Sequence, residues 1–228
     1  YNGTASNVTY ASGKFNKAAV FNGSNSSTSG VVLTNLNDTL EGTSFSISLW
    51  VKCSSTQSND NGEATIIGSA GSSGTAGFDI MLKPTTGYLF FNFGNPNNDT
   101  VSTTDLRDNT YHHIVFTYSS SQALLYLDGS LLLTENSPGS LSSIPNEITL
   151  GKWATGSYYA LSGQIDQVRI YNGIIKAEQV DELYAETVSD NDDLTLGAPP
   201  KSIVSANANA GFSICLLYTS PSPRDPIG

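Results

Sequence analysis

The chain has 228 residues, and its ten Lys and Arg against twenty Asp and Glu give a formal net charge of -10. A surface this acidic repels phosphate backbones, so nucleic acid is excluded as a partner. No apolar run reaches the ~18 residues of a membrane helix, and we expect no membrane insertion. Abundant Gly, Ser, Thr and Asn, with 13% charged and 10% aromatic residues, predict short strands joined by polar turns.

Apolar residues recur with the period of a β-strand along most of the chain. Residues 45–52 alternate with period two, which places Phe45, Ile47 and Leu49 on a core face and Trp50 on the opposite face. The segments 68–77 and 94–100 are rich in turn residues. Short apolar segments predict further strands at residues 18–21, 31–33, 65–68, 78–82, 88–93, 111–118, 147–151 and 163–171.

Residues 123–134 contain the strongest local signal, two apolar runs joined by Asp128 and Gly129. An Asp-Gly pair tolerates the positive φ angles of a type I′ turn, so this segment predicts a β-hairpin. Residues 176–187 form the one predicted helix, because Val180, Leu183 and Tyr184 recur at helical spacing. We expect this helix to lie as a short lid on the edge of an all-β, two-sheet antiparallel sandwich.

The ends of the chain differ from this central region. Residues 1–12 are interpreted as an upstream linker, because the chain begins at Tyr1 without Met, and residues 13–187 as the sandwich. An acidic and Pro-containing linker is expected at 188–200, and the start of a truncated downstream module at 201–214. We therefore interpret the chain as a fragment of a larger protein.

Residues 215–228 back-translate to a string that resembles a transposase sequencing adapter read in frame. We interpret them as disordered and foreign to the protein; a natural Pro-Ser tail is the alternative. Cys215 is then not a natural residue of the protein, and Cys53 is the one remaining cysteine. We interpret Cys53 as a small hydrophobic residue of the core.

Seven motifs follow one another along the chain, at 13–23, 45–52, 111–118, 125–129, 149–151, 163–172 and 177–184. In this order they resemble the laminin-G-like, concanavalin A-like jelly-roll family. Tyr111 stands where that family commonly has Trp, and Asn22 where many members have Asp. The resemblance implies a jelly-roll binding module.

The flanking segments carry a second, shorter resemblance. Residues 2–8 and 205–214 are similar to segments beside such domains in tail and fibre proteins of marine phages. This implies an extracellular or virion-surface location, with neighbouring domains of a longer chain as partners.

Catalysis is not expected. Glycosidases of this fold resemble one another in a Glu-x-Asp-x-x-Glu motif that holds two carboxylates about 5 Å apart, and the sequence lacks it. His112 and His113 are neighbours on a strand, so their side chains point to opposite faces and cannot bind one ion together. We interpret them as hydrogen-bonded structural residues.

Asp166 is the candidate metal ligand. Alternation along residues 165–170 puts it on the same face as Val168 and Ile170, where a buried carboxylate needs donors or a cation. The resemblance implies a structural calcium near this strand, so Asp166 with Asn22 is proposed as a calcium site. A carboxylate bonded to backbone N–H groups is the alternative.

Exposed aromatic and amide side chains are the candidates for a ligand surface, because sugar rings stack on Trp and Tyr while Asn and Asp bind their hydroxyls. Trp153, Tyr158 and Tyr159 share one predicted loop, whereas Asn97, Asn98 and Asp99 share another. Plugging of the sandwich end by Tyr159, and ordinary turns, are the alternatives. The sequence thus predicts a non-catalytic module that binds a glycan or another surface receptor. One alternative is an adhesion or decoration domain of a phage tail or fibre without a tight ligand. The other is a glycan-cleaving enzyme of the same fold, which the missing motif disfavours.

Overall fold

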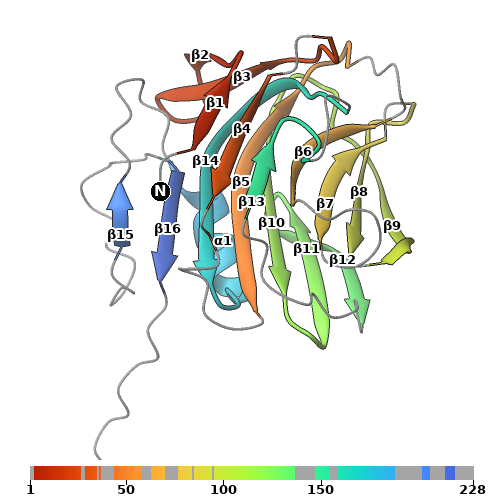
Figure 1. Ribbon diagram of the computed structural model, residues 1–228. Coiled ribbons are helices and arrows are strands. Elements are labelled where there is room, and N and C mark those ends of the chain that lie inside the picture. The colour runs from red at the N-terminus through yellow and green to blue at the C-terminus, as the bar shows by residue number, and fades with distance from the viewer. Residues whose placement is uncertain are drawn as a thin grey trace, which may run out of the picture.

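A computed structural model of the chain describes most of the sandwich (Figure 1). For residues 92, 93, 95–101, 202–205 and 214–218 it describes the main chain without the side chains. The described residues are 3–26, 29–34, 36, 44–57, 63–69, 77–83, 85–93, 95–136, 147–154, 159–187, 202–205 and 214–218.

Two sheets pack face to face, as predicted. The first has seven antiparallel strands. Its order is β1 (Thr4–Ser6), β4 (Gly30–Thr34), β13 (Glu147–Leu150), β6 (Ala64–Ser69), β7 (Phe78–Leu82), β8 (Tyr88–Phe93) and β9 (Asn95–Asp105).

The second sheet has nine strands. Its main order is β12 (Ser130–Asn136), β11 (Gln122–Leu127), β10 (Tyr111–Tyr118), β5 (Phe45–Cys53), β14 (Ser162–Asn172), β16 (Ile214–Tyr218) and β15 (Ser202–Ser205). In addition, β3 (Lys17–Asn22) pairs with β14, and β2 (Thr9–Ser12) pairs with β3.

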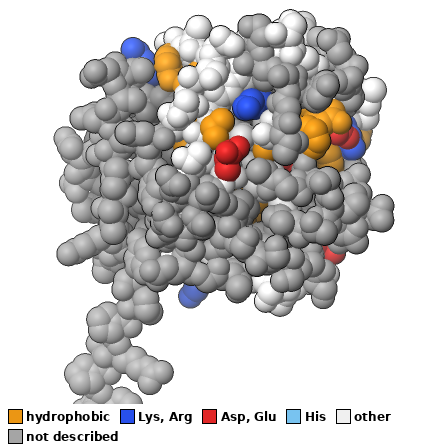
Figure 2. All heavy atoms as spheres, viewed as in Figure 1, with side chains coloured by type: hydrophobic (Ala, Val, Ile, Leu, Met, Phe, Trp, Pro, Cys, Tyr) orange, Lys and Arg blue, Asp and Glu red, His pale blue; other side chains and the backbone are white. Residues whose placement is uncertain are grey.

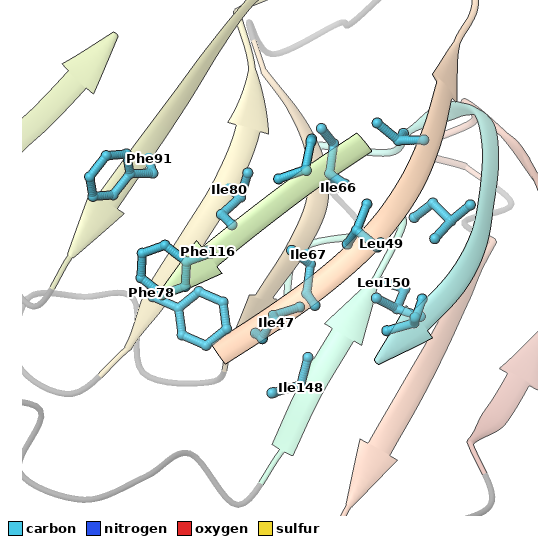
Figure 3. Packing of buried hydrophobic residues seen from close by; sticks show 14 of the residues in the cluster. Ile47, Leu49, Ile66, Ile67, Phe78, Ile80, Phe91, Phe116, Ile148 and Leu150 are labelled. Atoms are coloured by element: carbon cyan, nitrogen blue, oxygen red, sulfur yellow. The ribbon is translucent and has the colours of Figure 1, made fainter. Parts of the chain in front are cut away.

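The core lies between the sheets and is built by alternate residues of their strands (Figure 3). Phe78 of β7 and Phe116 of β10 come from opposite sheets, and their rings stack with centroids 5.6 Å apart. Cys53 is fully buried and unpaired, in agreement with its predicted role as a core residue. Truncating a fully buried Leu or Phe in such a core costs about 2–5 kcal/mol of folding stability.

The outer face of β5 is also buried. Trp50 is only 3% exposed, because α1 (Ala177–Ala185) covers this side of the second sheet. The helix is confirmed, but its expected position on the sandwich edge is wrong. It lies on the outer face, where a second apolar cluster is formed by Val115, Tyr126, Tyr171, Ile175, Val180 and Leu183. Among the described residues no helix is long and apolar enough to cross a membrane.

The hairpin is confirmed in detail. Asp128 and Gly129 have φ angles of 50° and 80°, as a type I′ turn requires.

The expectation of a turn-rich segment at 94–100 is wrong, because most of it belongs to β9, whose polar sequence shows no apolar alternation. The sequence interpretation also missed the exposed strands β1 and β2.

Part of the segment that we expected to be disordered forms a strand. β16 runs parallel to β14, with Val168 opposite Ile214 and Asn172 opposite Tyr218. β3 pairs with β14 only as far as Ile165, and β16 pairs with the part of β14 that follows. The adapter origin of residues 215–228 stays a prediction.

Candidate functional site

Trp153 and Tyr159 form an aromatic pair in the loop that joins β13 to β14. Their ring centroids lie 5.5 Å apart at an interplanar angle of 69°, an edge-to-face contact. Both side chains are half-buried, so part of each ring remains open to solvent. We call Trp153 and Tyr159 the aromatic platform. Tyr158, predicted for the same site, lies outside the described residues.

The main chain beside Tyr159 is held from two sides. Thr65 N–H of β6 donates to the Tyr159 carbonyl at 2.8 Å, and the Gln57 side chain donates to the Ala160 carbonyl at 3.1 Å. Tyr159 itself has a φ of 56°, a left-handed conformation that is costly for a bulky residue. Such strain persists only where surrounding contacts impose it, and it is common at binding sites.

The second predicted ligand loop does not join the aromatic platform. Asn97, Asn98 and Asp99 belong to β9, whose side chains in this stretch are not described. β9 is the edge strand four positions away from β13 in the first sheet. At about 4.8 Å per strand the two predicted sites are separated by roughly 19 Å.

Asp166 does not lie on the predicted core face. It pairs with Trp50 on the outer side of the second sheet, whereas Ile165 and Ile170 face the core. The reason is a β-bulge at Asp166, where Gln167 has a φ of 49° and the pairing with β5 shifts. Sequence alternation alone could not reveal this extra residue.

The surroundings of Asp166 do not fit the implied calcium site. Its Oδ2 accepts a hydrogen bond from Phe15 N–H at 2.9 Å, and its Oδ1 accepts one from Gln167 N–H at 2.8 Å. Burial raises the pKa of this carboxyl, and the backbone donors of Phe15, Gln167 and Lys14 oppose that effect. The arrangement matches the alternative of a carboxylate bonded to backbone N–H groups.

Asn22 is also too far from Asp166 to share an ion. It pairs with Ser162, four residues before Asp166 along β14, a separation of about 13 Å at 3.3 Å per residue. Its Oδ1 accepts hydrogen bonds from Ser24 N–H and the Ser29 hydroxyl. Among the described side chains, no three His, Cys, Asp or Glu gather in a way that could hold a metal ion.

His112 and His113 point to opposite faces of β10, as predicted. His113 is buried, and its Nε2 lies 2.8 Å from the Ser48 hydroxyl and its ring 4.9 Å from that of Trp50. Burial, together with the charge of Arg169, lowers the pKa of His113 to about 4. Trp50 is enclosed in this cluster, although the alternation of β5 places it on the face opposite the core.

His112 lies at the solvent end of β10, between two carboxylates. Its Nδ1 is 2.7 Å from Asp128 Oδ2, and its Nε2 is 3.2 Å from Asp108 Oδ2. The hydrogen bond to Asp128 is the main cause that raises the pKa of His112 above its usual value. The sequence interpretation missed both aspartates, although each lies in a turn within reach of the histidine pair.

Asp79 is a buried acid that the sequence interpretation also missed. It is 4% exposed on the outer face of the first sheet, and no group among the described residues bonds its Oδ1. Burial raises the pKa of Asp79 to about 8, with a further contribution from Glu63. Gly68 leaves room for the carboxyl, since a Cβ at that position would lie 2.2 Å from Asp79 Oδ1.

The surface offers few exposed apolar side chains. On the face in Figure 2, the hydrophobic side chains of the described residues lie in small groups among polar and charged ones. Large hydrophobic residues with high exposure in the described part of the chain are Tyr10, Leu131, Ile174 and Tyr184. The half-exposed aromatic platform therefore stands out by its pairing and its fixed main chain.

Comparison with known proteins assigns the chain to a family. Residues 22–181 match a laminin G family model of the concanavalin A-like lectin/glucanases superfamily. The chain therefore belongs to this family of jelly-roll sandwich domains. None of the curated proteins compared with the sequence matches it.

Three solved structures illustrate the likeness in fold. Domain 4 of AbnA, an extracellular arabinanase of family GH43 from Geobacillus stearothermophilus in complex with arabinotriose, has a TM-score of 0.59 at 22% identity and covers 80% of this chain and 87% of that one. The binding domain of Paraclostridial Mosquitocidal Protein 1 has a TM-score of 0.61 at 16% identity, with 80% and 47% covered. The binding domain of botulinum neurotoxin DC in complex with rat synaptotagmin II has a TM-score of 0.58 at 19% identity, with 81% and 46% covered. This chain thus spans about half the length of the two toxin binding domains.

Proposed function

We propose that the chain is a non-catalytic, glycan-binding module of an extracellular protein, and that the aromatic platform is its ligand-contacting surface. The observation that carries this proposal is the half-exposed Trp153–Tyr159 pair. Aromatic faces pack against the apolar faces of sugar rings, while neighbouring polar groups bind the hydroxyls. Because the main chain of Tyr159 and Ala160 is already fixed by hydrogen bonds, little ordering is needed on binding.

The structural neighbours support a binding role. They include a domain in complex with arabinotriose and a toxin binding domain in complex with a protein receptor. The first domain belongs to an extracellular arabinanase, which supports an extracellular location here. A glycan is favoured over a protein receptor because the platform is small, and the large hydrophobic residues with high exposure in the described part of the chain lie outside its loop.

The acids of the chain support a role without catalysis. Glycosidases of this fold resemble one another in a Glu-x-Asp-x-x-Glu motif, and the sequence does not contain it. Acids that lie close to one another in the described part of the chain make other contacts. Glu63 bonds Lys83 at 2.8 Å, and Asp108 and Asp128 both bond His112.

The test is a binding screen of the full chain against immobilised neutral oligosaccharides, with arabinotriose included. We expect at least one oligosaccharide to bind, and Trp153→Ala to weaken that binding about tenfold or more, because a central aromatic contact is lost. Tyr10→Ala is the matched control, since it removes an aromatic side chain that is 37% exposed on β2, away from the platform.

Two results would contradict the proposal. Binding that survives Trp153→Ala unchanged would exclude the aromatic platform as the site. A parent protein that binds no oligosaccharide would favour an adhesion or decoration domain without a tight ligand.

A further inference from the structure

His112 links two turns at one end of the sandwich. Its Nδ1 faces Asp128 in the β11–β12 turn, and its Nε2 faces Asp108 in the turn before β10. Asp108 in turn accepts hydrogen bonds from the Thr110 main chain and hydroxyl, both at 2.8 Å. We call His112, Asp108 and Asp128 the histidine latch.

The latch needs a proton to hold both turns. A charged imidazole donates from both nitrogens, so it can bond Asp128 and Asp108 at once, whereas a neutral ring donates from only one. The contact to Asp128 is the shorter, at 2.7 Å against 3.2 Å to Asp108. On deprotonation we expect Nδ1–H to stay with Asp128, and the Nε2 lone pair to face the Asp108 carboxylate and release it.

In the described part of the chain, the charged groups that face His112 are the two carboxylates of the latch. His113 follows on the opposite face of β10, and burial lowers its pKa to about 4. The Cys53 thiol, near Asp108, keeps its proton because burial raises its pKa. His112 differs from both, because the pKa of its ring is raised above the usual 6.5.

The turn that carries Asp108 is joined to the next loop through Asn109. Asn109 N–H donates to the Cys53 carbonyl at 3.2 Å, and its side-chain amide donates to the Ser55 hydroxyl at 3.1 Å. Ser55 N–H donates back to Asn109 Oδ1 at 3.3 Å. A shift of the Asp108 turn therefore acts directly on residues 54–57.

Residues 54–57 hold the aromatic platform in place from the other side. Ser54 N–H donates to the Ser162 carbonyl at 2.9 Å. The Gln57 amide bonds both flanks of Leu161, donating to the Ala160 carbonyl at 3.1 Å and accepting from Ser162 N–H at 2.5 Å. Ala160 follows Tyr159, so a continuous series of hydrogen bonds runs from His112 to the platform.

We propose that protonation of His112 regulates the aromatic platform, closing the latch and holding the loop of Tyr159 in its binding conformation. The inference rests on the proposed function in taking the platform as the ligand site. The coupling itself depends only on the hydrogen bonds between the latch and Ala160.

The pH window follows from the direction of the shift. The hydrogen bond to Asp128, with the charges of Asp128 and Asp108, raises the pKa of His112 above its usual 6.5 despite partial burial. The folded chain therefore binds this proton more tightly than the unfolded chain. The latch is fully closed below about pH 6.5 and opens as the pH rises through the higher pKa of the folded state.

The experiment is a titration of the full chain by nuclear magnetic resonance between about pH 5.5 and pH 9. We expect the amide resonances of Ala160 and Ser162 to shift with the same midpoint as the His112 ring. In His112→Gln that transition should be lost. In Asp108→Asn, which removes one charge of the latch, the His112 midpoint should fall and the shifts at Ala160 and Ser162 should shrink. Asp105→Asn is the matched control, because Asp105 pairs with Arg107 in the same segment and has no contact with His112.

The coupling is overturned if Ala160 and Ser162 do not move while the His112 ring titrates, or if their transition persists unchanged in His112→Gln. The readout needs no ligand. A failure to bind oligosaccharides would therefore count against the proposed function and leave the coupling standing.

Discussion

Asp166 and Asp79 are both buried acids, but their surroundings differ. Asp166 accepts hydrogen bonds from the backbone of the loop before β3 and of the bulge in β14, so both of its oxygens have partners and these donors oppose the effect of burial on its pKa. Asp79 lies beside Gly68 with an oxygen that has no hydrogen-bond partner in the described part of the chain, and its burial favours the neutral acid. Asp166 therefore connects two backbone segments, whereas Asp79 destabilises the fold once it ionises.

Asp166→Ala tests the structural role of the first acid. The substitution leaves backbone N–H groups of Phe15 and Gln167 without an acceptor, so we expect a loss of about 2–4 kcal/mol in urea denaturation. Because both carboxylate oxygens are already bonded, calcium should leave the melting temperature of the parent unchanged. A melting temperature that falls with EDTA in the parent, and no longer does so in Asp166→Ala, would restore the calcium site.

Asp79→Asn tests the second acid. The folded chain binds the Asp79 proton more tightly than the unfolded chain, because burial raises its pKa from 3.8 to about 8. The stability associated with this proton is complete below about pH 3.8 and is lost as the pH rises to about 8. Asn cannot ionise, so the variant does not lose this stability. The melting temperature of the variant minus that of the parent should therefore increase steadily from pH 5 to about pH 8. A difference that stays constant with pH would show that Asp79 is not held neutral.

At the scale of the elements, the sequence predicted the strands that build the core, since alternation is clear wherever one face is buried. Phe78–Leu82, Tyr88–Phe93 and Tyr111–Tyr118 have the predicted bounds. β9 could not be predicted in this way, because an edge strand of polar residues has no core face to mark. The bulge in β14 escaped for a related reason, since an extra residue at Gln167 shifts the alternation that the prediction assumed.

The candidate site was only partly predictable. Trp153 and Tyr159 lie close in sequence, so the composition of one loop was enough to suggest the pair. The hydrogen bonds that fix it come from Gln57 and Thr65, which are about a hundred residues away in the chain. Contacts of that range depend on how β6 and the loop after β5 meet the loop before β14.

Gly129→Ala tests the turn between β11 and β12. Gly129 has a φ of 80°, and an added Cβ would approach the Tyr184 ring of α1 to 3.1 Å. We expect a loss of about 1 kcal/mol or more in urea denaturation, from backbone strain and from crowding against α1. Ser130→Ala, at the exposed position next in the chain, is the control and should change stability by less than about 0.5 kcal/mol. Equal effects of the two substitutions would contradict the role of the turn.

In the molecule as a whole, the residues that stabilise the fold and the residues proposed to bind a ligand lie in different parts. The two sheets and α1 bury both faces of the second sheet, so substitutions there change folding. The loops at the ends of the sandwich connect these layers and can vary without disturbing them. Asp108 and Asp128 of the latch and the aromatic platform lie in such connections, while His112 lies at the start of β10. The hydrogen bonds between these parts are the proposed route by which the latch acts on the platform.

The central claim is that the aromatic platform binds a sugar, and the most direct measurement is the indole resonance of Trp153 during titration with arabinotriose or the best oligosaccharide of the screen. Trp50 is an internal reference, because it is buried in the cluster under α1. If the aromatic platform binds the sugar, we expect a saturable shift of the Trp153 indole resonance with little change at Trp50. A Trp153 resonance that does not move while the protein binds the sugar would contradict it.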